Sequence, residues 1–219
     1  MRRLLATAQE SRPGVETGMA FVGRVDPEGR RIGLVCRIGS WDGARAEGPP
    51  REVEVAPFLV DRREVTCAEY KAFCDTTGTR YPPSWTDGRI PAGQEDRPVS
   101  EVTQAEAAAY ARHAGKSLPT ATQWEAAARG EDGRTYPWGD ELGTEASDVS
   151  PFGVRDLAGS VAEWTRTCDW DVEGGDGWIV KGAAAPESGF YLRAAAVRTF
   201  RASERRPGLG FRCVLDLGE

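Results

Sequence analysis

The sequence predicts an α+β domain built from short antiparallel strands, flanking helices and long loops. Three observations indicate this fold class: short apolar runs divided by turn signals in the first third, three helix-start signals in the middle, and a Gly-, Trp- and Asp-rich last third with few helix signals. The chain has 219 residues and is 40% hydrophobic, which suits one sizeable core and is short for two full domains.

The first third carries the strand signals. The apolar runs Met19–Val22 and Ile32–Cys36 are separated by Asp26-Pro27-Glu28-Gly29, a turn signal. A third run, Val53–Val60, is interrupted by Pro57, which predicts an edge strand or a bulge because proline cannot donate to a strand ladder.

The middle of the chain carries three helix starts. Each is a capping box, in which a threonine hydroxyl accepts from a backbone N–H and the acid or amide three residues later reaches back. The boxes are Thr66–Glu69, Thr103–Glu106 and Thr120–Gln123. The second and third helices are expected to end near Gly115 and at Gly130.

The last third predicts loops and short strands, closed by a strand at Leu209–Leu215. No internal repeat or linker divides residues 18–219, so we expect one domain there. Residues 1–17 start like a signal peptide, but the apolar run is too short for one, and we interpret them as a tail or docking arm. No run of about 18 apolar residues could span a membrane, so we expect a cytoplasmic protein without a membrane partner.

Composition excludes several function classes. The net charge of −6 argues against a nucleic-acid partner. The five cysteines suggest no disulfide framework, and His113 is the only histidine, so a zinc site is not expected. Lysine occurs only three times and asparagine is absent, a composition that either a GC-rich coding bias or a hot source environment would produce.

Six segments in order resemble the formylglycine-generating enzyme, or sulfatase-modifying factor, family. The strongest match is Leu118–Gly130, with the sequence LPTATQWEAAARG. The other five are Phe58–Thr66, the pair Arg97–Ser100 with Ala107–Tyr110, Tyr136–Asp140, Asp156–Thr165 and Gly210–Cys213. The resemblance runs from about residue 18 to the end and implies an irregular C-type-lectin-like fold, which serves enzymes and binders alike. Four aromatic residues of the matched segments are expected to be largely buried: Trp124, Trp138, Trp164 and Phe211.

The resemblance also shows what this chain lacks. The family's enzymes bind copper with two cysteines, since soft thiolates suit Cu(I). The matching stretch here, Lys181–Arg193, contains no cysteine; Cys213 matches a structural cysteine, and Cys168 precedes the stretch. Another branch of the superfamily holds iron with several histidines, which one histidine cannot do. We therefore expect no catalytic residue, no copper and no enzymatic activity.

A structural Ca²⁺ ion is implied by the segment that matches a calcium loop of relatives. Carried over by position, its ligands are the carboxylates of Asp156 and Glu163 and the backbone carbonyls of Gly159 and Val161, hard oxygen donors of the kind that Ca²⁺ prefers. The alternative is that Asp156 caps a turn and Glu163 pairs with an arginine. A second calcium site needs an insertion after Asp148-Val149 that this chain lacks.

The remaining resemblance is to the variable proteins of diversity-generating retroelements, which present diversified residues ahead of a closing Gly-Phe-Arg strand. Residues 188–203 all belong to the set that adenine mutagenesis of asparagine codons can reach, and residues 180–208 are the expected variable segment. Aromatic residues on a scaffold of small residues are typical of evolved binding surfaces. The expected solvent-facing patch binds a protein or other macromolecule and consists of Pro186, Glu187, Ser188, Phe190, Tyr191, Thr199, Phe200, Arg201, Glu204 and Arg206.

Two alternatives to this binder stay open. One is a regulatory or sensor domain of the same family, and the least favoured is a copper-dependent formylglycine-generating oxidase. Arg193, Arg198 and Arg212 are left out of the patch because they match scaffold arginines that hold loops through charge-assisted bonds.

Overall fold

The computed structural model describes residues 18–41, 47–142, 148–169, 175–184 and 189–217. The elements follow the chain in this order: β1 (Met19–Val22), β2 (Arg24–Val25), β3 (Arg31–Ile32), β4 (Leu34–Ile38), β5 (Arg51–Val55), β6 (Phe58–Asp61), α1 (Cys67–Thr77), a 3-10 turn at Thr86–Gly88, α2 (Gln104–His113), α3 (Ala121–Arg129), β7 (Ala162–Asp169), β8 (Gly177–Lys181), α4 (Gly189–Leu192), β9 (Arg198–Arg201), β10 (Leu209–Gly210) and β11 (Val214–Asp216). This α+β architecture of short strands, flanking helices and loops is the predicted one. No helix in these residues is long and apolar enough to cross a bilayer.

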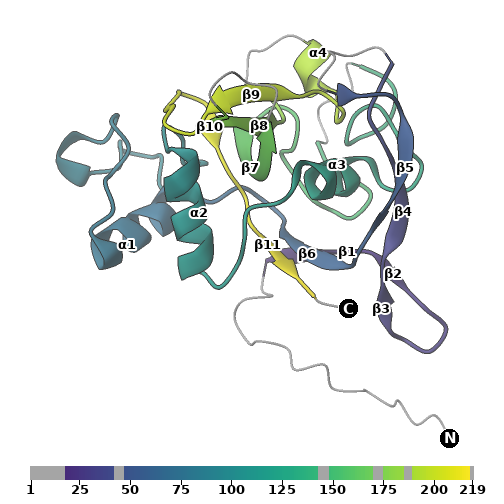
Figure 1. Ribbon diagram of the computed structural model, residues 1–219. Helices are drawn as coiled ribbons and strands as arrows, with labels where there is room; N and C mark the ends of the chain where they lie inside the picture. Colours follow the sequence, from purple (N-terminus) through teal and green to yellow (C-terminus); the bar gives the residue numbers. More distant parts are fainter. Residues whose placement is uncertain (1–17, 42–46, 143–147, 170–174, 185–188, 218–219) are drawn as a thin grey trace, which may run out of the picture.

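The strands form two main sheets and two hairpins. The first sheet has the order β1-β6-β11, the second β10-β7-β8-β9, and the hairpins are β2-β3 and β4-β5. All pairings are antiparallel except that of β10 with β7. The closing strand β11 therefore lies in the same sheet as β1, on the other side of β6, so the first and last strands of the described chain share one sheet (Figure 1).

Three predicted strands are interrupted in the structure. Gly33 divides the run at residues 32–36 into β3 and β4, and Ala56-Pro57 divides the third run into β5 and β6, which belong to different sheets. The predicted closing strand 209–215 splits into β10, paired with β7, and β11, paired with β6. The residues between them are buried, so the chain crosses from one sheet to the other through the core.

The three capping boxes form as predicted. In each, the threonine hydroxyl accepts from the backbone N–H three residues on, and that residue's side chain accepts from the threonine N–H. Helix α3 ends at Gly130, as expected, and α2 ends at His113, two residues before Gly115. Caps of this kind each contribute about 1 kcal/mol to helix stability.

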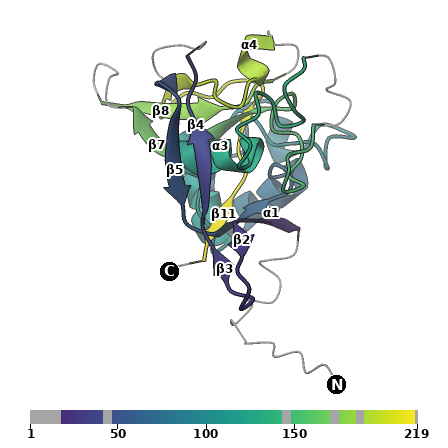
Figure 2. The same cartoon turned by 90° about the vertical axis from the view of Figure 1, so that its right-hand side faces the viewer.

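The core has two clusters separated by the second sheet. One lies between α1, α2 and that sheet and contains Trp164 and Phe211; the other lies between α3, the first sheet and the β4-β5 hairpin and contains Trp124 (Figures 1 and 2). These three side chains are buried as expected. Trp138 was expected to be buried too, but it is only half-buried, because it stacks on Tyr136 at 5.1 Å at the edge of its loop.

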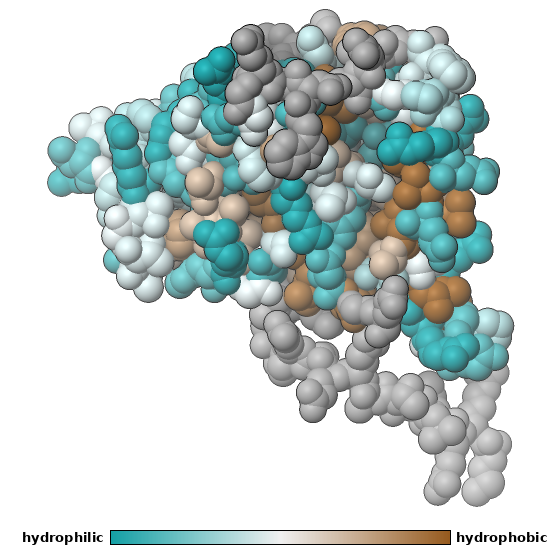
Figure 3. Space-filling view, in the orientation of Figure 1, coloured by the Kyte–Doolittle hydropathy of each residue, from teal (hydrophilic) through white to brown (hydrophobic). Residues whose placement is uncertain are grey.

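Apolar side chains are also exposed on the side formed by the β2-β3 and β4-β5 hairpins. Val25, Ile32 and Val35 are exposed there. On the side of the molecule where these hairpins lie, Figure 3 shows brown apolar surface divided by teal hydrophilic surface. Scattered exposure of this kind is ordinary for a folded protein.

Candidate binding surface

Aromatic rings and arginines form one continuous series of contacts across α4, the residue that follows it, β9 and the loop after β9. The Arg193 guanidinium lies 4.1 Å from the Phe190 ring centre, and Phe190 meets Tyr191 edge to face at 5.3 Å. Arg198 lies over Tyr191 at 4.9 Å and over Phe200 at 5.7 Å, and Arg206 covers Phe200 at 4.2 Å. We call these six residues the aromatic–arginine ladder: Phe190, Tyr191, Arg193, Arg198, Phe200 and Arg206.

The ladder joins parts of the predicted patch that are distant in sequence. Five of the ten predicted residues belong to it or contact it: Phe190, Tyr191, Phe200, Glu204 and Arg206. Phe190 is 39% exposed, Tyr191 is half-buried, and Glu204 accepts from Nε of Arg206 at 2.7 Å. Arg193 and Arg198 complete the series, although the sequence analysis assigned them to the scaffold alone; the alternation of Arg198 and Phe200 on one strand face is the signal that could have found them.

The other predicted patch residues lie elsewhere. Thr199 and Arg201 are on the opposite face of β9 from Phe200 because successive side chains of a strand alternate. The Thr199 hydroxyl donates to Asp169 at 2.6 Å, whereas Arg201 is exposed. Pro186, Glu187 and Ser188 lie outside the described residues.

Phe200 is not a free surface ring. It is half-buried, packs against the first core cluster and meets Trp164 edge to face at 6.3 Å. Exposure therefore decreases along the surface from Phe190 to Phe200, and a substitution at Phe200 should lower the free energy of unfolding more than one at Phe190.

The three arginines left out of the patch do hold the scaffold, as expected. Nη2 of Arg193 donates to Glu47 at 2.8 Å, and Nη2 of Arg198 donates to the Gly182 carbonyl at 2.7 Å. Arg212 is fully buried, and Nε and Nη2 each donate to Glu163 at 2.8 Å. Two of these side chains thus serve the scaffold and the ladder together.

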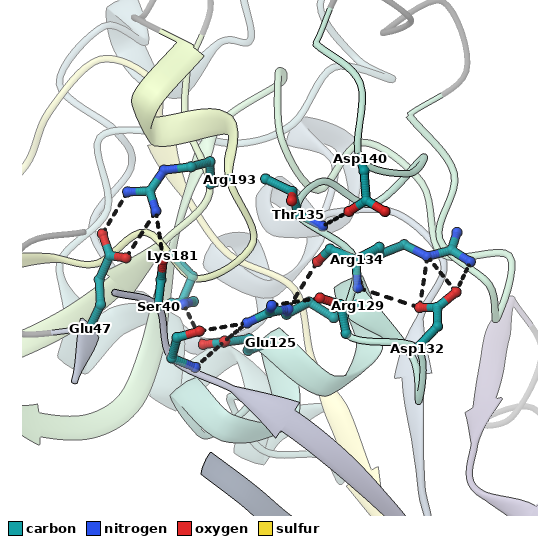
Figure 4. A network of polar contacts seen from close by, with 12 residues as sticks. Ser40, Glu47, Glu125, Arg129, Asp132, Arg134, Thr135, Asp140, Lys181 and Arg193 are labelled. Atoms are coloured by element: carbon teal, nitrogen blue, oxygen red, sulfur yellow. Dashed lines mark hydrogen bonds and ion pairs between the residues drawn. The ribbon is translucent and has the colours of Figure 1, made fainter. Parts of the chain in front are cut away.

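A buried charge network lies behind the ladder and ties it to the β4-β5 connection (Figure 4). Nζ of Lys181 donates to Glu125 at 3.0 Å, and Arg129 bridges Glu125 to the Gly39 carbonyl, each at 2.9 Å. Burial lowers the pKa of Lys181, and Glu125 offsets part of that effect. Burial also acts to raise the pKa of Glu125, but Lys181 and Arg129 outweigh it and leave that pKa below its usual value.

The segment predicted to bind calcium is held by protein groups. Both carboxylate oxygens of Glu163 accept from Arg212, and one also accepts from the Trp124 indole at 2.9 Å. This ion pair is the alternative to calcium binding that the sequence left open, and it engages the Glu163 carboxylate that was expected to bind the ion. Asp156 has a positive φ of 59°, and its carbonyl accepts from Arg212 at 3.3 Å.

The neighbouring carboxylate of Asp148 has one oxygen that lacks a hydrogen-bond partner among the described residues. Oδ2 of Asp148 accepts from the Ala158 N–H at 2.7 Å, while Oδ1 is buried and has no hydrogen-bond partner among the described residues. Burial raises the pKa of Asp148, and the nearby charge of Asp156 raises it further. Asp148, which was not among the ligands expected from the sequence, is therefore a further candidate ligand at this loop.

Four of the five cysteine side chains are buried. All five are free, and the pKa values of Cys36, Cys67 and Cys74 are each raised to about 11 by burial. Burial also raises the pKa of Cys213. Burial thus favours the neutral thiol form of these four side chains.

Comparison with known families decides the origin of this scaffold. The family model described as the sulfatase-modifying factor enzyme 1-like domain matches residues 33–151 and 144–217. The chain belongs to the sulfatase-modifying factor family.

Sulfatase-modifying factor relatives include active and inactive proteins. The chain is 28% identical to the formylglycine-generating enzyme of Thermomonospora curvata over 78% of this chain and 86% of that protein. It is also 28% identical to inactive C-alpha-formylglycine-generating enzyme 2 of Bos taurus, over 82% and 84% of the two chains. The chain spans 26 to 45% of three longer bacterial relatives, among them hercynine oxygenase of Mycolicibacterium thermoresistibile and the kinase Pkn1 of Chlamydia trachomatis.

Two solved structures share the fold. PvdO from Pseudomonas aeruginosa superposes with a TM-score of 0.71 at 19% identity, and Treponema denticola variable protein 1 with 0.65 at 18%. Each comparison covers 90% of this chain and 94% of the other. At this identity the likeness establishes the fold alone.

Proposed function

We propose that this chain is a non-catalytic ligand-binding protein that displays the ladder on a sulfatase-modifying factor scaffold, as the variable protein of a diversity-generating retroelement does. The observation that carries the proposal is the absence of the thiol pair from a stretch that leads into the aromatic–arginine ladder. The stretch that would hold the catalytic thiol pair contains no cysteine, and the described end of that stretch begins the aromatic–arginine ladder.

The composition of the ladder supports binding. Aromatic and arginine side chains dominate the energetics of protein interfaces because they bury large areas with few rotatable bonds. In the ladder each ring is already held by a guanidinium, so less conformational freedom is lost when a ligand docks.

An inactive relative supports the absence of catalysis, and an active one points the other way. A direct assay separates the two. Incubated with a sulfatase-type cysteine peptide, with and without copper, this protein should produce no formylglycine by mass spectrometry, because no thiol pair lies in 181–193. The Thermomonospora enzyme is the positive control, and turnover above background by this chain would refute the proposal.

Diversification is tested by sequencing the locus in sister isolates. Scatter confined to residues 180–208, with the scaffold arginines unchanged, is the expected result. A fixed sequence across isolates would favour the alternative, a regulatory or sensor domain for one dedicated partner. The match to about a quarter of the kinase Pkn1 favours that alternative, because there the matched region is part of a longer signalling protein.

Calcium enters this proposal as a structural ion. Asp148 and Asp156 would hold it with backbone carbonyls of the loop, and its charge would compensate the orphaned Asp148 oxygen. Glu163 would remain with Arg212.

A further inference from the structure

A second cleft, of about 400 Å³, lies where β6 leads into α1. Its lining includes residues 61–66, Tyr110, Lys116 and Arg155. Figures 1 and 2 show β11, which pairs with β6, well below α4. The cleft shares no residue with the aromatic–arginine ladder and is a separate feature of the surface.

Three arginines of this cleft have donors that the protein does not use. Arg63 and Arg155 are exposed, and neither side chain has an ion pair or hydrogen bond within the described residues. Arg62 is also exposed, and its one side-chain contact is from Nη1 to the Gly153 carbonyl at 3.2 Å. Unlike the ladder arginines, these guanidinium groups are not committed to a ring or a carboxylate.

The acidic residues of the lining do not cancel these charges. Asp61 accepts from Nζ of Lys116 at 2.6 Å, so that pair is neutral. Glu64 is buried, and burial raises its pKa to about 7, so it stays mostly protonated below that pH. Glu69 is exposed and accepts from the Thr66 N–H at 2.8 Å in the capping box of α1. One solvated carboxylate therefore faces three unpaired guanidinium groups, and the cleft is basic although the whole chain carries a net charge of −6.

The cleft also has a neutral donor without a partner. The Tyr110 ring is fixed by the core, because it meets Phe211 edge to face at 5.3 Å and stacks on Tyr70 at 6.0 Å. Its hydroxyl makes no hydrogen bond to any described residue, and burial raises its pKa. Tyr110 thus keeps its proton and can donate it to a ligand in the cleft.

This set of donors suits a phosphate group better than a carboxylate. A phosphate monoester carries a charge of about −1.5 to −2 at pH 7 and three terminal oxygens, which several guanidinium groups can share. Arginine is the preferred residue for such contacts because its planar group donates two parallel hydrogen bonds. The volume of the cleft lies within the range of small-molecule sites.

We propose that this cleft binds a small phosphorylated molecule. Arg63 and Arg155 hold the phosphate oxygens, and the Tyr110 hydroxyl donates to one of them. The inference goes beyond the proposed function, since it concerns a second ligand at a site without ladder residues.

The test is isothermal titration calorimetry of the full chain with glycerol 3-phosphate, inorganic phosphate and succinate at a constant ionic strength of about 100 mM. Glycerol 3-phosphate should bind several-fold more tightly than the other two. Arg63→Gln and Arg155→Gln should each weaken its binding by about 10-fold, the loss of one charge-assisted hydrogen bond, and Tyr110→Phe by about 3- to 10-fold. Arg112→Gln on α2 changes an exposed arginine outside the cleft and should leave binding unchanged.

The variants separate binding from folding. Arg63 and Arg155 are exposed, so their substitution should leave the melting temperature nearly unchanged while binding is lost. No heat of binding at about 10 mM glycerol 3-phosphate, or an equal loss in Arg112→Gln, would refute the site. Succinate binding as tightly would refute the preference for phosphate, and inorganic phosphate binding as tightly would show that only the free ion is recognised. None of these outcomes alters the formylglycine assay or the sequencing result, by which the proposed function itself stands or falls.

Discussion

Arginine serves two regions of this molecule in opposite ways. Arg212 is completely buried and surrounded by Glu163, Glu64 and backbone carbonyls, whereas Arg206, at the end of the ladder, lies on the Phe200 ring at the surface. In the first region the charge is removed from water and each donor is matched to an acceptor. In the second the guanidinium remains near solvent and supports rings that are available to a ligand.

The two regions therefore differ in how much a substitution lowers the free energy of unfolding. Removing one partner of a buried pair leaves an uncompensated charge, while a solvated cation over a ring contributes about 0.5–1 kcal/mol. A protein with a variable surface needs surface substitutions to have small effects on stability, because the surface must change while the scaffold stays folded.

The largest effect is expected at the buried pair. Arg212→Met should lower the free energy of unfolding by about 3–5 kcal/mol, because it strands the Glu163 carboxylate in the core. Urea unfolding followed by tryptophan fluorescence measures this change. The double variant Glu163→Gln with Arg212→Met should recover much of the loss, and a double variant no better than the single one would contradict this account of the region.

A pH-dependent effect is expected at Glu64, whose pKa is raised from 4.5 to about 7 by burial, against the opposing effect of Arg212 at 3.8 Å. The folded state then retains a proton that the unfolded state releases. The stabilisation is complete below about pH 4.5 and is lost as pH rises to about 7. Glu64→Gln should therefore raise stability at about pH 8 by about 1–3 kcal/mol and change it little at about pH 4.5.

Urea midpoints at the two pH values measure the Glu64 effect, and Glu54→Gln on the exposed face of β5 is the control. Equal shifts for the two variants would show that the Glu64 carboxyl behaves like a solvated one.

A smaller effect is expected from calcium. Binding to the folded state alone stabilises by about 1.4 kcal/mol when calcium exceeds its Kd about 10-fold, so calcium should raise the melting temperature over a chelator. Asp148→Asn and Asp156→Asn should each abolish the difference. Identical melting curves for the unmodified chain with calcium and with chelator would remove the ion from the proposal.

The smallest stability effect is expected at the exposed end of the ladder. Phe190→Ser with Arg206→Ser should change the free energy of unfolding by only about 0.5–1 kcal/mol, since both side chains are exposed. Phe200→Ser should cost more because that ring packs against Trp164. Thermal melting ranks the two variants, and the reverse ranking would break the proposed grading of the surface.

Several features of the site were predictable because they are local. The capping boxes depend on residues three apart, and the absence of cysteine from residues 181–193 is read directly from the sequence. Trp138 and Thr199 were placed differently by the structure, because loop packing and strand facing decide exposure there. Glu163 was ambiguous in sequence, since a carboxylate can face an ion or an arginine, and Arg212 lies 49 positions away.

The sequence by itself determined the family scaffold, the helix starts, the absence of cysteine from 181–193 and the arginine-rich character of the closing segment. Those properties follow from short-range chemistry and from residue identity. Only the tertiary structure decided that β10 and β11 belong to different sheets. It also decided that Arg198 contacts two aromatic rings and that Trp41 and Arg193 line the same pocket. The physical reason is that each of these joins residues that the folded core brings together, and no local propensity encodes their meeting.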